Sequence, residues 1–272
     1  GTTRNVALKK SAIFRGVPDG GAAVICLDTE HADVLIKAAK VQQLRLFSYG
    51  EHAQASVRLL AWNSATGQAH VQTPNGEFDL HMPGLGKHMV LNAMACVATA
   101  IALNLPVAPL LQALGSFKPA EGRGELLTVT VNGSKVTVID ESYNANPASM
   151  RATLRQLGQT PATRRIAVLG SMKELGDFAP AMLAQLVEPI REAHVDHLVL
   201  VGDEMRALAR ELGKGNVVTL AAPLSFAHCD GPGEAIAALE EYGLAGGDAV
   251  LVKGSNSIGL GRLVTHLVDR GR

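Results

Sequence analysis

The densest group of chemically versatile side chains lies at residues 140–147, in the string Asp-Glu-Ser-Tyr-Asn-Ala-Asn-Pro. Two carboxylates, a tyrosine and two asparagines follow an expected strand there, and Pro147 suits the first turn of the next helix. Such groups can hold ribose hydroxyls or order a cation. The structural alternative is that Asn146 caps the helix and Asp140 accepts hydrogen bonds from loop amides. From these residues alone both interpretations stay open.

Two short glycine-containing segments carry cations that suit an anionic ligand. Residues 253–256, Lys-Gly-Ser-Asn, precede the last expected helix, whose free backbone amides and dipole attract an anion. Arg123 lies between Gly122 and Gly124, where its planar guanidinium can donate two parallel hydrogen bonds to a phosphate. A plain loop and an exposed linker arginine are the structural alternatives.

A possible nucleotide-base contact lies further upstream. His88 and Asn92 are one turn apart in an expected helix and therefore share a face. A ring and an amide placed in this way suit a base, although helix capping or core hydrogen bonding would use the same residues. Lys9 and Lys10 read as a solvated pair from composition alone. The serine, histidine and aspartate residues lack the Gly-x-Ser-x-Gly turn that would accompany a nucleophilic triad.

The elements that must position these residues change character along the chain. Residues 20–82 read as short apolar or alternating runs separated by turns, which predicts a strand-rich region. Helices follow, and the run 118–124 predicts a linker. Beyond it, strands alternate with helices, which predicts an α/β fold with a parallel sheet whose ligands gather at the carboxyl ends of the strands. We expect strands at 22–27, 44–49, 56–62, 69–73, 77–82, 126–131, 135–140, 166–169, 197–201, 217–220 and 249–252, and helices at 88–103, 107–114, 147–158, 180–193, 204–212, 233–242 and 257–270.

The composition narrows the class of protein. Of the 272 residues, 47% are hydrophobic and 18% charged, which is enough to bury a core and excludes disorder as the overall state. The 25 Lys plus Arg balance the 25 Asp plus Glu, which argues against a nucleic-acid partner. Cys26, Cys96 and Cys229 are far apart and indicate neither a disulfide framework nor a zinc site. The sequence has neither a signal peptide nor the roughly 18 apolar residues of a membrane span, so we expect a soluble, cytoplasmic protein.

Four strings, taken in order, resemble the Mur ligase family. They are Gly-Arg at 122–123, the string at 140–147, Gly-Ser-Met-Lys-Glu-Leu-Gly at 170–176 and Leu-Val-Lys-Gly-Ser-Asn at 251–256. Their order and spacing agree across essentially the whole chain. The agreement is greatest with the members that add the dipeptide D-Ala-D-Ala to UDP-N-acetylmuramoyl-tripeptide, a peptidoglycan precursor.

The resemblance implies an α/β architecture in two parts. Residues 1–118 would be the later part of the central ATP-binding domain, and residues 119–272 the Rossmann-like C-terminal ligase domain. The family's phosphate loop, Gly-Thr-Asn-Gly-Lys-Thr, is absent from the sequence. We therefore expect a fragment that does not couple ATP cleavage to dipeptide addition alone, with the missing N-terminal and phosphate-loop segment as a partner and 118–124 as the hinge.

The reaction that the resemblance implies is ATP-dependent amide-bond formation. ATP would activate the carboxylate of the UDP-linked peptide as an acyl phosphate, and Mg²⁺ and fixed cations would stabilise the charge while the dipeptide's amine attacks. By position, Lys10 matches a lysine that the family carbamylates to ligate magnesium, and Arg123 matches a phosphate-contacting arginine. His88 and Asn92 match the adenine-side motif, and Asp140 matches an acidic residue near the ribose or phosphate. The acceptor-facing positions are Tyr143, Asn144, Asn146, Lys253, Gly254 and Ser255, with Lys253 and Ser255 expected to orient the dipeptide's carboxylate.

Five positions depart from the family's pattern. Relatives commonly carry Asn, Asn, Asp, Asp and His where this chain has Cys26, Met89, Glu141, Ser171 and Leu183. The changes at 89 and 171 remove polar groups from positions expected to face the nucleotide or the acceptor. The alternative is therefore a non-catalytic Mur-like module that binds a nucleotide or peptide, or docks onto a partner. The string Tyr-Asn-Ala-Asn-Pro disfavours a related ligase such as a folylpolyglutamate or cyanophycin synthetase.

Overall fold

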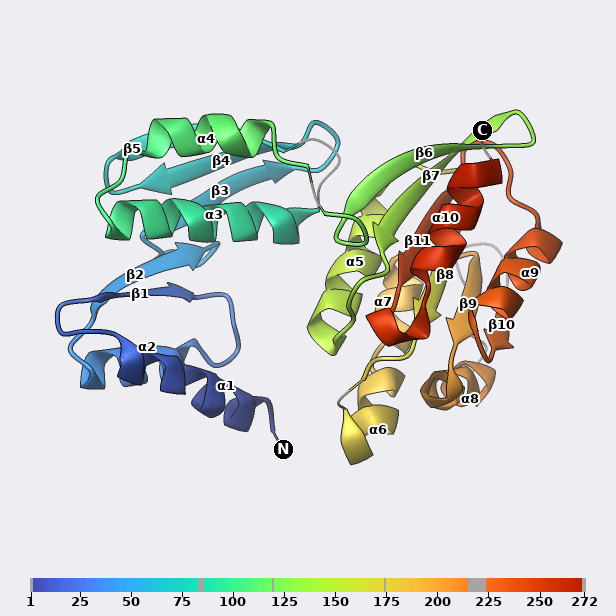
Figure 1. Cartoon of the computed structure of the whole chain (residues 1–272), viewed down its shortest axis with the longest axis horizontal. Helices are drawn as coiled ribbons and strands as arrows, with labels where there is room; N and C mark the ends of the chain where they lie inside the picture. The colour runs from blue at the N-terminus through green and yellow to red at the C-terminus, as the bar shows by residue number, and fades with distance from the viewer. Residues whose placement is uncertain (1, 83–85, 119, 174, 215–223, 271–272) are drawn as a thin grey trace. The chain divides into compact units, whose positions relative to one another are not determined.

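Two compact units, Gly1–Phe117 and Lys118–Arg272, make up the chain, and each has its own sheet and its own apolar core (Figure 1). The expected mixed α/β class is confirmed. The computed structural model describes residues 2–82, 86–118, 120–173, 175–214 and 224–270. Within those residues, no helix combines the length and the apolar character that a membrane crossing requires.

The first unit is built on a five-stranded sheet whose strands follow one another in chain order. The first three strands are parallel, and the last three form an antiparallel meander. The carboxamide oxygen of Asn63 closes the β3–β4 hairpin by accepting hydrogen bonds from the amides of Ala65 and Thr66. The elements are α1 (Thr3–Ser11), β1 (Ala22–Cys26), α2 (Ala32–Val41), β2 (Arg45–Gly50), β3 (Val57–Asn63), β4 (Gln68–Thr73), β5 (Gly76–His81), α3 (Lys87–Ala102) and α4 (Val107–Gly115).

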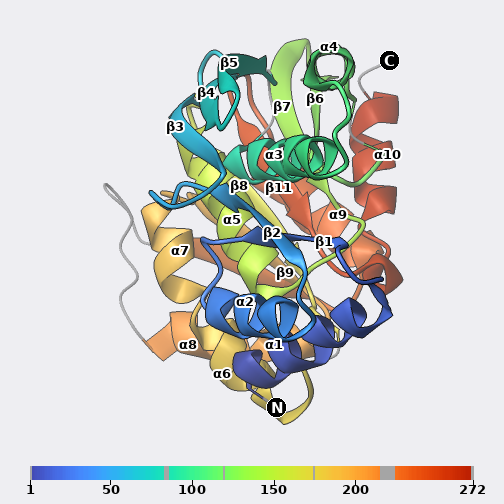
Figure 2. The same cartoon turned by 90° about the vertical axis from the view of Figure 1, so that its left-hand side faces the viewer.

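Helices cover both faces of β1 and β2 in this unit. In two views α2 lies against one face and α3 against the other (Figure 1, Figure 2). The alanine-rich α3 buries Val90, Met94 and Val97, which pack with Leu59 and Val71 of the sheet. Burial of this helix face fixes the position of the histidine and asparagine expected to meet a base.

The second unit is built on a six-stranded sheet in the order β10-β9-β8-β11-β7-β6. All neighbours are parallel except β6 and β7, which form an antiparallel hairpin at one edge. Parallel strands joined through helices place their carboxyl ends at one edge of the sheet. The elements are β6 (Glu125–Val131), β7 (Ser134–Glu141), α5 (Pro147–Gln159), β8 (Arg165–Gly170), α6 (Ala179–Ala184), α7 (Val187–Glu192), β9 (His197–Val201), α8 (Arg206–Lys214), β10 (Ser225–Cys229), α9 (Pro232–Tyr242), β11 (Ala249–Lys253) and α10 (Gly261–Arg270).

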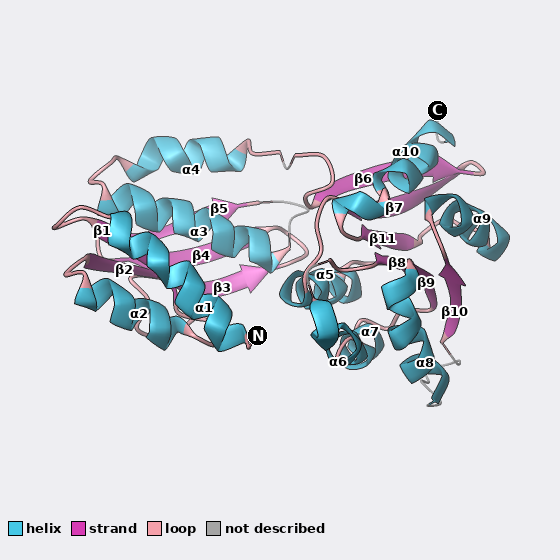
Figure 3. Ribbon diagram, turned by 60° about the horizontal axis from the view of Figure 1, so that its bottom comes forward, coloured by secondary structure: helices cyan, strands magenta, loops and turns pink. Residues whose placement is uncertain are grey.

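Helices cover both faces of this sheet (Figure 3), and an apolar core lies on each face. Leu251 of β11 packs on the face covered by α5 to α8, while its neighbours Val250 and Val252 pack on the face covered by α9 and α10. Successive side chains of a strand point to opposite faces, so a strand buried on both sides is apolar at every position. Each of these three side chains is fully buried.

The structure contains two helices in the first unit that the expected strand-rich pattern omitted, α1 and α2. The segment Ala-Asp-Val-Leu-Ile-Lys-Ala-Ala-Lys-Val of α2 has charged residues at helical spacing between its apolar ones. The first unit is therefore less dominated by strands than expected.

The second unit differs from expectation at two places. The single helix expected at 180–193 is two short helices, α6 and α7, because Pro189 lacks the N–H that would bond to the carbonyl of residue 185. The strand expected at 217–220 lies outside the described residues, and the edge strand β10 follows it at Ser225–Cys229.

Candidate functional site

The carboxyl edge of the six-stranded sheet gathers most of the residues that the sequence singled out. β7 ends at Glu141 and β11 ends at Lys253, and the register of the two strands pairs these residues directly. Both side chains lie on the face covered by α5, because they alternate with Asp140 and Val252. The strands thereby bring together residues that are 112 positions apart in the sequence.

A buried lysine forms the centre of this edge. The Lys253 ammonium, 1% exposed, donates hydrogen bonds to Oε2 of Glu141 at 3.2 Å and to the backbone carbonyl of Asn144 at 2.9 Å. Burial lowers the pKa of Lys253, and the Glu141 carboxylate opposes that shift. The ammonium thus lies beneath the loop that starts at residue 142 and holds that loop through a main-chain oxygen.

Asp140 organises the turn that carries the candidate phosphate ligand. Its buried carboxylate accepts hydrogen bonds from the amides of Gly122 at 3.1 Å and Ser142 at 3.0 Å. Gly122 has a φ of +72°, and a Cβ there would lie 3.0 Å from the backbone nitrogen of Tyr143. Only glycine suits this conformation and this close approach. These contacts match the alternative in which Asp140 accepts hydrogen bonds from loop amides. Contact between Asp140 and a ribose or phosphate stays a prediction.

Arg123 lies over the ring of Tyr143. The guanidinium carbon is 3.9 Å from the ring centroid, a cation–π contact between the two loops that Asp140 joins. The arginine is exposed, and among the described residues it has no acidic partner. Stacking fixes the plane of the guanidinium and leaves the N–H groups along its edge directed outward for an anion.

The asparagines of the same loop have defined local roles. Asn146 caps α5: its side chain accepts a hydrogen bond from the amide of Ser149 at 2.9 Å, and the Ser149 hydroxyl accepts one from the amide of Asn146. Asn144 accepts a hydrogen bond from the amide of Ala145. Contact between either side chain and an acceptor substrate stays a prediction.

Gly254 and Ser255 close the edge beside β8. A Cβ on Gly254 would lie 3.2 Å from the Cα of Gly170, so the two strand ends approach more closely than a side chain would allow. The Ser255 hydroxyl accepts a hydrogen bond from the amide of Lys173 at 3.1 Å. The Lys253 ammonium contacts the loop that starts at residue 142, and the Ser255 hydroxyl contacts the loop after β8. Their expected joint binding of a carboxylate therefore stays a prediction.

A further ion pair at this edge was not anticipated from the sequence. Lys173, after β8, donates a hydrogen bond to Glu204, after β9, at 2.7 Å, and both side chains are partly exposed. Hydrogen bonds from Lys173 and then from Ser171 lower the pKa of Glu204 to about 2. The sequence indicates that both residues follow strands, but their pairing depends on the order of the strands in the sheet.

The remaining predicted residues lie in the first unit. His88 is half-buried and Asn92 exposed on α3, one turn apart as expected. The Asn92 side-chain amide donates a hydrogen bond to the sulfur of Met89 at 3.7 Å. Met89 is one of the five positions that depart from the family's pattern. Lys10 is exposed in the last turn of α1.

A magnesium site is not completed by the described part of the chain. No group of three or more His, Cys, Asp or Glu side chains that could hold a metal ion occurs among these residues. Lys10, if carbamylated, would supply one oxygen ligand, and the described residues around it do not supply the set of carboxylates that a magnesium ion normally shares.

Family models for Mur ligases match most of the sequence. The Mur ligase middle domain matches residues 1–100, and the Mur ligase, glutamate ligase domain matches residues 122–256. The second match contains every loop of the carboxyl edge described above, from Gly122 to Ser255.

Similar proteins agree with these matches. The chain is 33% identical, over 98% of its length, to the UDP-N-acetylmuramoyl-tripeptide--D-alanyl-D-alanine ligase of Mycobacterium tuberculosis and covers 55% of that protein. The enzyme of the same name from Escherichia coli is 28% identical over 79% of the chain, with 47% of that protein covered. A crystal structure of MurF from Acinetobacter baumannii superposes with a TM-score of 0.80 at 26% identity, covering 97% of this chain and 55% of that one. The chain thus spans about half the length of the curated relatives it matches.

Proposed function

Because the chain belongs to the Mur ligase family, we propose that it serves the ATP-dependent ligation of D-alanyl-D-alanine to UDP-N-acetylmuramoyl-tripeptide in peptidoglycan synthesis. The observation that carries this proposal is the 33% identity, over 98% of the chain, to a relative with that name. Residues 1–118 would contribute to ATP binding, and residues 119–272 would receive the dipeptide. On the family resemblance alone we place the reaction in the cytoplasm.

Each unit would contribute a distinct set of residues. Lys10, when carbamylated, would be one ligand of a magnesium ion whose other ligands the described residues do not supply, and ATP would supply the phosphoryl group that activates the peptide's carboxylate. His88 and Asn92 would meet the adenine, and Asp140 would meet the ribose or phosphate region. The acceptor side would consist of Tyr143, Asn144, Asn146, Lys253, Gly254 and Ser255.

Arg123 is the residue we expect to stabilise the negative charge that develops on a phosphoryl oxygen. Its exposure, its stacking on Tyr143 and its lack of an acidic partner among the described residues leave the guanidinium edge available for a phosphoryl oxygen. A preorganised cation aimed at such an oxygen stabilises the transition state more than the ground state. Tyr143 would then orient the arginine.

Lys253 and Glu141 would act by positioning the acceptor loop. The buried ammonium bonds the carbonyl of Asn144, so the loop that includes Tyr143 is tied to the end of β11. A loop held in this way presents its outward side chains in one arrangement, which lowers the entropic cost of aligning the dipeptide's amine. Any direct contact between Lys253 and the dipeptide would require this loop to move.

Two measurements test the proposal. In the first, this chain replaces the matching half of the Mycobacterium tuberculosis relative, and ADP release is followed with the UDP-linked tripeptide and D-Ala-D-Ala. In the second, D-Ala-D-Ala is titrated into the ¹⁵N-labelled chain, with L-Ala-L-Ala as the stereochemical control. We expect ADP release that requires both substrates, and amide shifts at 143–146 and 253–255 with the D-dipeptide only.

The outcomes separate the proposal from a non-catalytic module. Dipeptide binding without ADP release in a folded chimera would favour the binding module, and ADP release with D-glutamate instead of the dipeptide would assign another member of the family. Arg123→Gln should lower kcat by about 100-fold. Arg155→Gln, which removes an exposed arginine from α5, is the matched control and should leave kcat unchanged.

A further inference from the structure

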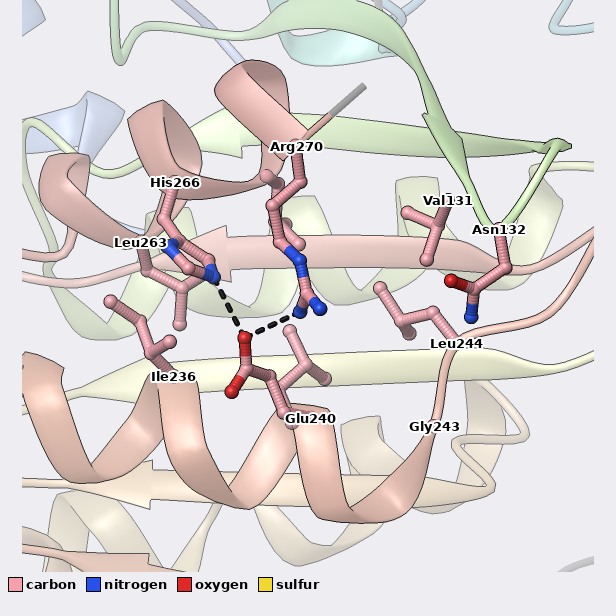
Figure 4. Close-up of a pocket in the computed structure, with 11 residues that line it drawn as sticks. Val131, Asn132, Ile236, Glu240, Gly243, Leu244, Leu263, His266 and Arg270 are labelled. Atoms are coloured by element: carbon pink, nitrogen blue, oxygen red, sulfur yellow. Dashed lines mark hydrogen bonds and ion pairs between the residues drawn. The ribbon is translucent and has the colours of Figure 1, made fainter. Parts of the chain in front are cut away.

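A pocket in the second unit lies at the amino edge of the sheet, opposite the edge proposed for the acceptor. It is enclosed by the last turns of α9 and α10 and by the β6–β7 turn at Asn132 (Figure 4). Both helices start after the carboxyl ends of strands and run back across the sheet, so their C-terminal turns lie at the opposite edge. The pocket is therefore separate from the proposed substrate site.

The floor and walls of the pocket are apolar. Leu239, Leu263 and Leu267 form the floor and belong to the buried core beneath α9 and α10. Ile236 and Leu244 continue the walls. The cavity of about 130 Å³ is close to the roughly 150 Å³ of an apolar protein cavity that accepts benzene. An apolar group the size of one small ring or a branched alkyl chain fits this space.

One side of the pocket carries a charged cluster. Oε1 of Glu240 accepts hydrogen bonds from Nε2 of His266, at 3.0 Å, and from Arg270. Figure 4 shows the Arg270 guanidinium between Glu240 and Asn132. Glu240 holds the guanidinium there, and a guanidinium has five N–H donors in a fixed plane, so donors remain for a second partner.

The opposite side adds a neutral donor. Asn132 lines the pocket with a φ of +50°, at the tip of the β6–β7 turn. Among the described residues its carboxamide has no hydrogen-bond partner. A carboxylate seated between Asn132 and Arg270, on the side of the guanidinium away from Glu240, would accept hydrogen bonds from both.

We propose that this pocket binds a small amphipathic carboxylate, with its compact apolar group on the leucine floor and its carboxylate between Arg270 and Asn132. The apolar group would displace water from the leucine side chains, and the charge-assisted bonds to Arg270 would fix its orientation. The site shares no residue with the proposed acceptor loop and does not depend on the ligase proposal.

Benzoate is the probe that matches both parts of the pocket. Titration into the ¹⁵N-labelled chain is expected to shift amides of α9, α10 and the β6–β7 turn, while benzamide and benzylamine, which keep the ring but lack the carboxylate, bind more weakly by about tenfold or more. Arg270→Gln is expected to weaken benzoate binding by at least about fivefold. Arg262→Gln removes an arginine from the first turn of α10, away from the pocket, and is expected to leave binding unchanged.

Three results would overturn the proposal. They are the absence of shifts at millimolar benzoate, equal binding of benzamide and benzoate, and equal weakening by the two arginine variants. Ile236→Phe adds an independent measurement, because it fills the apolar space without changing any charge. Circular dichroism checks that each variant is folded, and a folded Ile236→Phe variant that still binds benzoate as well as the unmodified chain would also overturn the site.

Discussion

Strand β11 is flanked by two ion pairs that are built very differently, one buried and one whose arginine is partly exposed. At its amino end Asp248 pairs with Arg164, and at its carboxyl end Lys253 pairs with Glu141. The two pairs belong to the same sheet and lie a few residues apart along one strand. The two pairs therefore allow the amino edge and the carboxyl edge of one sheet to be compared.

The amino-end pair makes several hydrogen bonds, both within the pair and to the backbone. Arg164 bonds both oxygens of Asp248, at 2.9 and 2.6 Å, and also donates to the carbonyl of Gly243. Asp248 accepts a further bond from the amide of Ala245. A bidentate pair with additional bonds to two backbone groups fixes the loops that enter β8 and β11.

The carboxyl-end pair is joined by one hydrogen bond of 3.2 Å, and its lysine has a lowered pKa because burial disfavours the charged form. Burial of this ammonium costs stability, and local costs of this kind concentrate at functional sites. The comparison indicates that the amino-end pair stabilises the fold and the carboxyl-end pair positions the site.

The largest effect on stability is expected from Asp248→Ala. It removes both bonds to Arg164 and the acceptor for Ala245, so the free energy of unfolding should fall by about 3 kcal/mol. Urea denaturation of the chain measures this change. Glu188→Ala breaks an exposed pair with Arg191 and is the matched control, with an expected loss of at most about 0.5 kcal/mol. Similar losses in the two variants would contradict the structural role of the amino-end pair.

Lys253→Met should affect activity more than stability. It releases the Asn144 carbonyl, and the misplaced loop should lower the ligation rate by about 100-fold in a chimera that carries out the reaction. The variant removes the cost of burying the ammonium but leaves the Glu141 carboxylate without its lysine, so part of the stability is lost as well.

The double variant Lys253→Met with Glu141→Gln sharpens this test. It removes the carboxylate that the single variant leaves without its lysine, so we expect it to recover stability but not activity. Recovery of activity together with stability would assign the pair to the fold, as at the amino end.

Much of the second unit was predictable because its signals are local. Strands buried on both faces are apolar at their interior positions, as in β8, β9 and β11, and the polar loops after them mark the carboxyl edge. Pro189 is a local signal for the interruption between α6 and α7, but it lies within a run whose apolar residues favour one continuous helix. In the first unit, the segment of α2 lies between two expected strands and the strand-rich pattern assigns it no element, although its charged residues have helical spacing.

The pairings within the site were not predictable in the same way. Lys173 and Glu204 are 31 residues apart, and Arg164 and Asp248 are 84 apart, so only the order of strands in the sheet brings them together. The sequence indicated that Lys253 follows a strand, but its burial depends on the loop folded over it. Side-chain partners set by strand order and loop packing have no counterpart in spacing along the chain.

Acid should affect the amino edge before the carboxyl edge. His197, buried at the start of β9, stacks on Tyr242 with ring centroids 4.0 Å apart. Burial and then the nearby Arg164 lower the pKa of His197, whereas an unfolded chain binds this proton near pH 6.5. The unfolded state therefore binds more protons below about pH 6.5, and stability falls as the pH drops from there toward the folded pKa, by up to about 1.4 kcal/mol per pH unit.

Urea denaturation between pH 7.5 and 5.5 tests this order. His197→Gln should flatten the dependence of stability on pH, because its side chain does not titrate. Glu204→Gln at the carboxyl edge is the control, because the pKa of Glu204 is about 2 and its titration lies below this window. An unchanged slope in His197→Gln would contradict the burial argument.

The smallest effect is expected from Lys173→Gln at the carboxyl edge. The lowered pKa of Glu204 taken alone suggests a strong pair, but the side chains of Lys173 and Glu204 are 47% and 38% exposed, and water and salt screen such contacts. We expect Lys173→Gln to lower the free energy of unfolding by at most about 0.5 kcal/mol, and less in high salt. Urea denaturation at two salt concentrations measures both. A loss as large as that of Asp248→Ala would mean that exposed pairs also stabilise this fold, and the two edges would no longer differ in kind.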